Sequence, residues 1–486
     1  MGILSGLEPA SVFGYFEEIT RIPHGSADVK VISDYLVHFA EERHLEVRQD
    51  EALNVVIKKP ASAGYDCDQT LMIQGHMDMV AVQDPGTSID MTKDPLELEI
   101  KDGYVHAKGT SLGGDDGIAV AMALAILDDD TIEHPALEVV LTTGEEIGML
   151  GADALDTSDL KAKYLLNLDS ETEGELLAGC AGGAAVTAHF PVQTVQKVGT
   201  VIDITVEGLI GGHSGQDIDK QRANASVIMG RLLYELRKDS LYSLISINGG
   251  EKDNAITIRS DARILVDSNE YVEPIIDMIH AFEKKVKEEY RVTDPDLSII
   301  ARAGETGTFT ALTDVLQEQI CSTIFTMPYG VQSMSMDLPG LVESSLNLGI
   351  LSTKNDEIEI TWSVRSSIQS IKELLIDKIT CIVETFGGTV TISGDYPAWP
   401  FNPGSKISGL CSRIYEKQTG KKAKIMSMHA GVECGLLLGK MPGLDIVSMG
   451  PTLLDIHTTR EHMDIASVQR TWKLVLEVLK EFRTIC

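Results

Sequence analysis

The chain lacks the features that mark disulfide-rich, secreted and membrane-spanning proteins. Its seven cysteines stand singly with no CxxC pair, which argues against a disulfide framework and against a thiolate zinc site. The longest apolar run, 117–127, is far shorter than the ~20 residues of a membrane span. The first ten residues, MGILSGLEPA, have no basic segment and no long apolar core, so no signal peptide is expected. These absences favour a cytoplasmic protein.

Basic charge is also scarce. The 41 Lys and Arg residues face 73 Asp and Glu residues, which gives a formal net charge of −32. Such an excess of carboxylate repels nucleic acid and anionic membrane surfaces, so neither is an expected partner. Hydrophobic content of 43% and charged content of 23% are ordinary for a globular protein. At 486 residues the chain exceeds what one core usually supports, so we expect at least two domains.

The first part of the chain alternates short apolar runs with helical patterns. Apolar runs at about 52–58, 71–76, 137–146 and 163–171 predict buried strands. The segment that follows GGDDG (113–117) is apolar nearly all round, which predicts a buried helix. Strands alternating with helices predict an α/β domain with a mixed sheet flanked by helices.

From about residue 187 the pattern changes. Strands that alternate apolar and polar residues are interrupted by helices expected at 216–237, 272–286 and 367–386, an order typical of an α+β module with one open sheet face. Two groups of similar order suggest a duplicated ferredoxin-like module. After YPAWP (396–400) the first pattern returns. We therefore predict an α/β catalytic domain, 1–186 and 397–486, with an inserted α+β lid domain, 187–396.

Metal-competent side chains follow the buried strands of the first pattern. Ligands at the carboxyl ends of strands are the usual placement of a site in an α/β sheet. A mixed set of imidazoles and carboxylates suits zinc, cobalt or manganese. The candidates are His76, Glu145, Glu146 and Asp169 at strand ends, Asp115 at the start of the buried helix, and His457 after a strand-like segment in the resumed domain.

Charge counting favours two ions over one. Asp115, Glu146 and Asp169 carry three negative charges and a bridging hydroxide a fourth, which two divalent cations balance. Two such ions can share a carboxylate and activate one water, which leaves Glu145 free as a general base. Asp78 faces the same way as His76 on a continuing strand, so it can hold one ring nitrogen of that histidine. Singly, each feature is more often a solvated face or a turn; their ordered recurrence favours a site.

The motifs GHMDMV, GTSLGGDDGIA, TTGEEIG, LLNLDSE, GCAGG and IGGHSG occur in the same order as in the co-catalytic zinc peptidases. That family includes aminoacylase, carboxypeptidase G, peptidase T and peptidase V. The chain resembles it over essentially its whole length, and most closely its members that cleave Xaa-His dipeptides. The resemblance implies a cytosolic dipeptidase that uses a hydroxide bridging two Zn²⁺ per chain, for which Co²⁺ or Mn²⁺ can substitute.

The resemblance also implies a role for each candidate in the catalytic domain. Asp115 would bridge the two ions, one held also by His76 and Asp169 and the other by Glu146 and His457. Glu145 would deprotonate the water and later protonate the leaving amine. Asp78 would orient His76, and the peptide bond between Asp115 and Asp116 would be cis.

In the lid, the resemblance implies that His213 stabilises the oxyanion of the tetrahedral intermediate. Asn254 and Arg365 would hold the substrate, Arg365 by pairing with the carboxylate of a small peptide. Gly431 lies on a segment similar to the substrate-binding loop of the family. The insertion is large enough for a lid that roofs the site in cis. The family commonly forms homodimers, and the sequence leaves the oligomeric state open.

Three other functions stay open at this point. One is an amidohydrolase of the same fold that acts on N-acyl amino acids or longer peptides. Another is a dinuclear phosphoesterase, although the adjacent Glu145 and Glu146 and the lid argue against it. The last is a non-catalytic binding protein, which the complete set of ligands and base disfavours.

Overall fold

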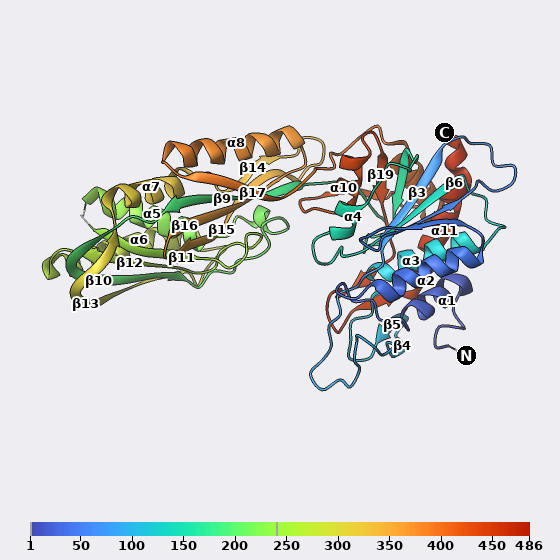
Figure 1. The fold of residues 1–486 in the computed structure, drawn as a ribbon, viewed down its shortest axis with the longest axis horizontal. Coiled ribbons are helices and arrows are strands. Elements are labelled where there is room, and N and C mark those ends of the chain that lie inside the picture. Colours follow the sequence, from blue (N-terminus) through green and yellow to red (C-terminus); the bar gives the residue numbers. More distant parts are fainter. Residues whose placement is uncertain (1, 240–241) are drawn as a thin grey trace. The chain divides into compact units, whose positions relative to one another are not determined.

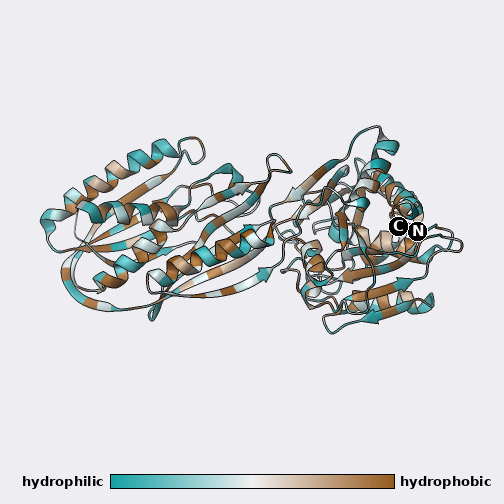
Figure 2. Ribbon diagram, turned by 90° about the horizontal axis from the view of Figure 1, so that it is seen from above, coloured by the Kyte–Doolittle hydropathy of each residue, from teal (hydrophilic) through white to brown (hydrophobic). Residues whose placement is uncertain are grey.

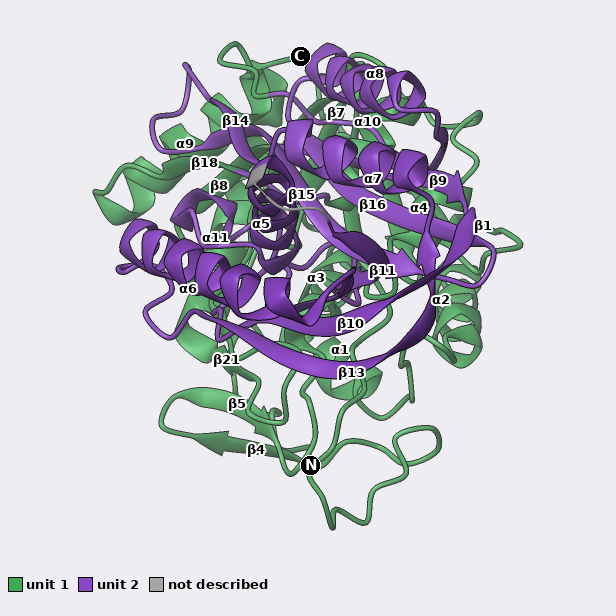
Figure 3. Cartoon of the chain, turned by 90° about the vertical axis from the view of Figure 1, so that its left-hand side faces the viewer, with its two compact units in different colours: residues 1–179, 401–427, 432–486 green, residues 180–400, 428–431 purple. Residues whose placement is uncertain are grey.

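The computed structural model describes residues 2–239 and 242–486, and its contacts divide the chain into two compact units (Figure 3). Unit 1 is Met1–Gly179, Phe401–Ser427 and Val432–Cys486, and unit 2 is Cys180–Pro400 and Met428–Gly431. The sequence pattern placed the inserted domain at 187–396. The structural insertion begins earlier because strand β9 belongs to the sheet of unit 2 from its first residue, Gly182. Among the described helices, none combines the length and the apolar character that crossing a bilayer demands.

Unit 1 is built on an eight-stranded mixed sheet of order β1-β2-β6-β3-β7-β19-β8-β18, of which β3, β6 and β19 are labelled in Figure 1. Its strands are β1 (Glu46–Gln49), β2 (Val55–Lys59), β3 (Thr70–His76), β6 (Ala136–Thr142), β7 (Tyr164–Asn167), β8 (Glu175–Cys180), β18 (Lys424–Met428) and β19 (Asp445–Ser448). A separate small sheet holds β4 (Leu98–Lys101), β5 (Tyr104–Ala107), β20 (Leu453–Leu454) and β21 (His462–Asp464). The central strands β6, β3, β7 and β19 run parallel to their neighbours in this group.

Most helices of unit 1 pack with this sheet around one hydrophobic core, to which the two shortest, at 150–154 and 433–440, contribute no residue. They are α1 (Ala10–Ile19), α2 (Lys30–Glu42), α3 (Gly114–Asp128), α4 (Leu150–Ala154), α9 (Lys406–Thr419), α10 (Glu433–Lys440) and α11 (Ile465–Glu481). Every residue of α3 up to Leu127 is buried, as its uniform apolar pattern predicted. The carboxyl end of this helix lies against the buried Lys59, whose Nζ donates to the carbonyls of Ile126, Leu127 and Asp129 at 3.0–3.1 Å. That ammonium satisfies carbonyls that have no partner within the helix.

Period-two alternation gives the central strands of unit 1 two different faces. On β3, Leu71 and Ile73 belong to the hydrophobic core. Gln74 and His76 alternate with them, and Gln74 is hydrogen-bonded to Asn167 of β7 at 2.6 Å. The face that carries His76 is therefore lined by polar side chains next to the strand ends.

Unit 2 is built on a nine-stranded sheet of order β13-β10-β12-β11-β15-β16-β9-β17, with β14 paired to β15. The strands are β9 (Gly182–Pro191), β10 (Thr194–Glu207), β11 (Ser243–Gly249), β12 (Ser260–Val266), β13 (Ser298–Leu312), β14 (Gly330–Met334), β15 (Val342–Thr353), β16 (Glu357–Ser366) and β17 (Thr389–Tyr396). One half has the chain order β10-α5-β11-β12-α6-β13 and the other runs β9, α7, β15, β16, α8, β17. When the four strands of each half are numbered along the chain, their orders across the sheet are 4-1-3-2 and 2-3-1-4. The second is the first read from the opposite edge, so both halves have the order of a ferredoxin-like module and the expected duplication is present.

Four helices cover one face of this sheet: α5 (Ala225–Asp239), α6 (Val272–Glu289), α7 (Asp314–Thr326) and α8 (Gln369–Thr385) (Figure 1). Their buried hydrophobic residues pack with the strands in one core. Hydrophobic and hydrophilic residues alternate along these helices (Figure 2). The predicted helix at 216–237 was too long, because α5 begins only at Ala225. Asn224 caps the amino end of α5, since its Oδ1 accepts from the amides of Ser226 and Val227.

Cys67 and Cys486 form a disulfide, which the scattered cysteines did not predict. Tyr65 brings the two segments together, because its hydroxyl donates to the carbonyl of Leu479 and accepts from the amide of Arg483. The cysteines are 419 residues apart, so no spacing pattern could have indicated the pair.

Candidate metal centre

The parallel strands of unit 1 end at one edge of the sheet, where the metal-competent side chains collect. In the register of the sheet His76 pairs with Thr142 of β6, and Gln74 pairs with Asn167 of β7. Residues that follow these strand ends therefore lie side by side. Glu145 and Glu146 come three and four residues after β6 ends, and Asp169 comes two residues after β7 ends.

Asp115 lies between two histidines from distant parts of the chain. Its Oδ1 is 3.1 Å from Nε2 of His76, and its Oδ2 is 3.2 Å from Nε2 of His457. Nε2 of His76 is also 3.6 Å from Oδ1 of Asp169, and Nε2 of His457 is 2.9 Å from Oε2 of Glu146. The structure thus brings together all five side chains that the sequence singled out as metal ligands. The peptide bond between Asp115 and Asp116 is cis, as the resemblance implied.

The ring of His76 is held in one tautomer. Its Nδ1 lies 2.9 Å from the main-chain carbonyl of Asp78, which can only accept, so Nδ1 carries a proton and the neutral ring would present its lone pair at Nε2. The Asp78 carboxylate is farther from the ring, at 3.6 Å, and its Oδ1 accepts instead from the amide of Glu145 at 3.2 Å. Asp78 therefore orients His76 mainly through its backbone, and its side chain holds the segment of Glu145.

Burial and crowding of like charges shift the pKa values of this cluster. Burial, together with the carboxylates of Asp169 and Glu146, raises the pKa of Glu145 to about 9. Burial also raises the pKa of Asp169 to about 6. Hydrogen bonding to Asp115 and Glu146 raises the pKa of His457 to about 10. With so many carboxylates next to two imidazoles, the cluster favours the uptake of positive charge, as protons or as a bound cation.

A buried polar network lies on the same face of the sheet. Oε2 of Glu433, at the start of α10, accepts from Nε2 of Gln74 at 2.6 Å and from Oγ1 of Thr142 at 2.7 Å. Burial raises the pKa of Glu433 to about 7, and the carboxylates of Asp169 and Asp78 add to the shift. The sequence analysis missed Glu433, although it stands two residues after Gly431, in the segment that resembles the substrate-binding loop of the family.

In unit 2, His213 is held with its Nε2 as the protonated nitrogen. Its Nδ1 accepts from the amides of Gly215 and Gln216 at 3.2 and 3.1 Å, so the proton of the neutral ring is on Nε2. Burial and the charge of Arg365 lower the pKa of His213, which keeps the ring neutral. Such a ring can donate one hydrogen bond from Nε2.

Arg365 of β16 is a buried cation of unit 2, with 7% of its surface exposed. Its Nη1 donates to the hydroxyl of Tyr396 at 2.8 Å, and its Nε lies 3.4 Å from Oγ of Ser214. None of the carboxylates in the described ranges forms an ion pair with it. Gly431 packs against the ring of Tyr396, since a Cβ there would come within 2.5 Å of Cε2. An unpaired buried guanidinium of this kind is suited to bind an anion.

Asn254 and His429 are connected to the same group of residues, which we call the cluster of unit 2: His213, Asn254, Arg365, Tyr396, His429 and Gly431. The main-chain carbonyl of Asn254 accepts from the amide of Ser214 at 2.8 Å, which joins its loop to that of His213. Nε2 of His429 lies 2.7 Å from Oγ of Ser345, the strand neighbour of Arg365. Tyr396 and His429 escaped the sequence analysis because neither residue type marks such a role without its neighbours.

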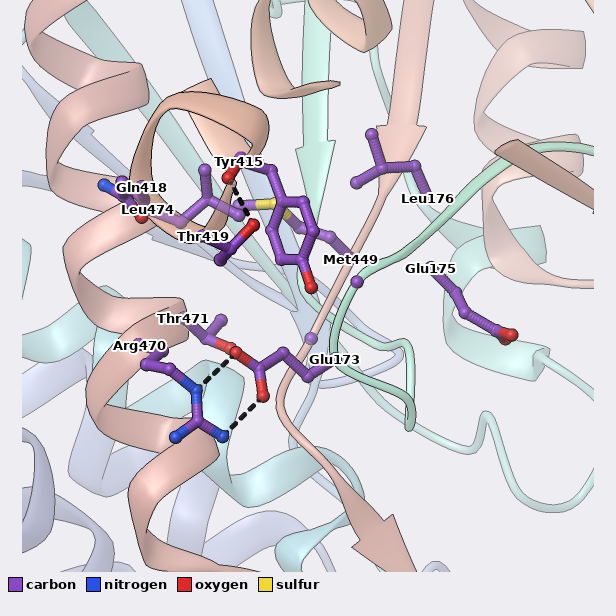
Figure 4. A pocket seen from close by; sticks show the side chains of 12 residues that line it. Glu173, Glu175, Leu176, Tyr415, Gln418, Thr419, Met449, Arg470, Thr471 and Leu474 are labelled. Atoms are coloured by element: carbon purple, nitrogen blue, oxygen red, sulfur yellow. Dashed lines mark hydrogen bonds and ion pairs between the residues drawn. The ribbon is translucent and has the colours of Figure 1, made fainter. Parts of the chain in front are cut away.

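A small hollow in unit 1 has a different character (Figure 4). It encloses about 10 Å³, roughly the space of one water. Arg470 lines it and is already paired with both carboxylate oxygens of Glu173 at 2.6 Å. The hollow therefore offers neither the volume nor the free charge of a substrate site.

Known proteins resemble the chain over its full length. The sequence pattern of peptidase family M20/M25/M40 matches residues 72–481. The cytosol non-specific dipeptidase of Escherichia coli K12 is 34% identical over 483 residues, 99% of both chains. The crystal structure of an aminoacylhistidine dipeptidase from Vibrio alginolyticus matches with a TM-score of 0.92 and 34% identity, over 99% of this chain and 98% of that one. An aminopeptidase from Bacillus cereus, 19% identical, shares the fold with a TM-score of 0.57, over 98% of this chain and 99% of that one.

Proposed function

The chain belongs to peptidase family M20/M25/M40, and on that premise we propose that it is a metal-dependent dipeptidase acting on Xaa-His and similar dipeptides. The names of the relatives from E. coli and V. alginolyticus support a dipeptide substrate. The E. coli name also supports a cytoplasmic location. Thiols in that compartment would favour the reduced forms of Cys67 and Cys486 over their disulfide.

One observation carries the proposal: the two oxygens of Asp115 face different histidines, His76 and His457. A carboxylate in this position can bridge two cations, each completed by an imidazole and a further carboxylate. The further carboxylates are Asp169 on the side of His76 and Glu146 on the side of His457.

The donor set fits two ions of the zinc type. It offers two imidazole nitrogens and three carboxylates, a mixture that suits Zn²⁺, Co²⁺ or Mn²⁺. The side chain of Glu146 is only 5% exposed, and its Oε1 has no hydrogen-bond partner among the described residues. When bound, such ions would polarise the scissile carbonyl and lower the pKa of the attacking water.

Glu145 is the proposed general base. Its segment is held by the bond from its amide to Asp78, and its carboxyl lies within 4.8 Å of ligand atoms of His76 and Glu146, where we assign it the base and not a ligand role. The positive charge of bound cations would oppose the rise of its pKa, and Glu145 would then be ionised before the reaction. It can then accept a proton from the attacking water and deliver it to the leaving amine.

The cluster of unit 2 suits recognition of a small peptide. We assign Arg365 to the carboxylate of the substrate, with Tyr396 and Gly431 holding the guanidinium in place. His213 would donate from Nε2 to the oxyanion of the tetrahedral intermediate. Asn254 would hold the substrate beside it. A carboxylate is also present in N-acyl amino acids, so the substrate panel below includes them.

The test is metal analysis of the purified protein combined with a substrate panel. We expect close to two equivalents of a divalent metal per chain, cleavage of Ala-His and carnosine, and loss of activity on chelation that added Zn²⁺, Co²⁺ or Mn²⁺ restores. Cleavage of N-acetyl amino acids or tripeptides in preference to dipeptides would instead favour the amidohydrolase. Dipeptide cleavage that a chelator left untouched would overturn the proposal.

A further inference from the structure

Glu461 is a buried carboxylate that binds four successive backbone amides at the start of α3. Its Oε2 accepts from the amides of Leu112 and Gly113 at 2.7 and 3.0 Å. Its Oε1 accepts from the amides of Gly114 and Asp115 at 2.8 and 3.3 Å. Only 3% of the Glu461 surface is exposed, so no solvent competes for these bonds.

The backbone around Gly113 is shaped for this contact. Gly113 has a φ of +67°, a left-handed conformation that turns successive amides toward one point and that glycine adopts without strain. A Cβ on Gly114 would lie 3.3 Å from Oε1 of Glu461, which leaves little room for any side chain. The amides also form the positive end of α3, where a carboxylate is stabilised by the helix dipole. The sequence motif GGDDG thus provides a socket for a carboxylate that comes from elsewhere.

Glu461 comes from the segment that also carries His457. The two residues are four positions apart, and His457 has a φ of +60°, which non-glycine residues seldom adopt. One segment therefore delivers an imidazole to Oδ2 of Asp115 and a carboxylate to the amide of the same residue. The contact ties together the two stretches of chain that must meet for the candidate metal centre to form.

We propose that Glu461 is a positioning residue for this centre. By holding the amides of residues 112–115, it fixes the orientation in which the two oxygens of Asp115 face His76 and His457. It touches neither substrate nor reacting atoms, and its effect is transmitted through the backbone of Asp115. The inference rests on the metal site of the proposed function, and it assigns that site a residue outside the ligand set.

A second buried glutamate in unit 1 provides a matched control. Glu138 of β6 is also 3% exposed, and its carboxylate accepts from the amides of Lys161 and Ala162 at 2.9–3.1 Å. It binds backbone as Glu461 does, but it contacts no ligand segment through these bonds. If Glu461 only stabilised the fold, replacing Glu461 and replacing Glu138 should therefore weaken metal binding equally.

The experiment measures metal binding by full-length wild type, Glu461→Gln and Glu138→Gln. Each protein is dialysed against chelator-buffered Co²⁺ at graded free concentrations, and bound cobalt per chain and its visible absorption spectrum are recorded. The amide nitrogen of Gln cannot accept, so Glu461→Gln leaves two backbone amides unpaired. We expect its second equivalent of Co²⁺ to bind about 10–100-fold more weakly, with an altered spectrum. Glu138→Gln should bind like wild type.

Glu461→Asp keeps the charge but shortens the side chain, so it should recover part of the affinity. It also serves as the test variant if Glu461→Gln does not fold. Wild-type affinity and spectrum in both Glu461 variants would overturn the inference, as would equal weakening in Glu138→Gln. The wild-type titration alone judges the proposed function, because a chain that binds fewer than two equivalents contradicts the dinuclear site itself.

Discussion

Nε2 of His457 lies 3.2 Å from Oδ2 of Asp115, although 342 residues separate them along the chain. The other carboxylate oxygen of Asp115 faces His76. One carboxylate at the start of a buried helix thus connects the first part of unit 1 with the part that follows the inserted unit.

Replacing Glu145 by glutamine should abolish turnover while leaving the metal content unchanged. Glutamine keeps the shape of the side chain but cannot accept a proton, so we expect kcat to fall by roughly 10²–10⁴-fold. Steady-state kinetics and metal analysis of the same preparation check this. Glu146→Gln is the matched control, since the neighbouring carboxylate contacts His457 and its loss should lower metal content as well. A fully active Glu145→Gln would show that another group takes the proton.

Replacing Arg365 by methionine should weaken recognition of the substrate carboxylate. A hydrogen bond to a charged group contributes about 1.5–3 kcal/mol, so kcat/KM for a dipeptide should fall by about 10–100-fold. For the corresponding dipeptide amide, wild type and variant should differ little. Arg263→Met is the control, because Arg263 lies on the same sheet but is 45% exposed and paired with Asp203. An equal loss for dipeptide and amide would contradict the assignment.

His429 should make the protein less stable as the pH falls from 6.5 toward 3. Burial, together with the charge of Arg365, lowers the pKa of His429 to about 3. The unfolded chain then binds a proton below about pH 6.5 that the folded chain does not, so stability is present above that pH and is lost on acidification. His429→Gln should remove a slope of at most about 1.4 kcal/mol per pH unit.

Urea unfolding of wild type and His429→Gln between pH 7.5 and 4.5 measures that slope. His38→Gln on the surface of α2 is the control, since 69% of the His38 side chain is exposed. Identical slopes in wild type and His429→Gln would show that the buried ring does not contribute to acid sensitivity.

Replacing Lys59 by methionine should destabilise unit 1. The substitution keeps the apolar stem but leaves the carbonyls at the end of α3 without their donor, which should lower the free energy of unfolding by about 2–4 kcal/mol. Lys58→Met is the control, because Lys58 makes surface ion pairs with Glu46 and Asp159, worth less than about 1 kcal/mol, and one long bond of 3.4 Å to the carbonyl of Asp159. Denaturant unfolding followed by circular dichroism gives both values, and equal effects would contradict the role of Lys59.

Most elements of unit 1, and the residues that form its candidate metal centre, could be predicted from the sequence. Buried strands and a buried helix have recognisable periods, and the polar residues that follow them, such as His76 and Asp169, must lie at one edge of a parallel sheet. The order of the two ferredoxin-like modules could be predicted for the same reason. These inferences need only local patterns and the geometry of sheets.

Only the tertiary structure decided how these residues are held. The backbone carbonyl of Asp78 orients His76, Glu461 binds the amides of residues 112–115, and Tyr396 supports Arg365. The disulfide between Cys67 and Cys486 belongs to the same class. Each contact joins distant segments or uses backbone groups that every residue possesses, so no pattern of side chains in the sequence predicts it. Periodicity determines which residues reach a site, and packing determines which neighbours fix them there.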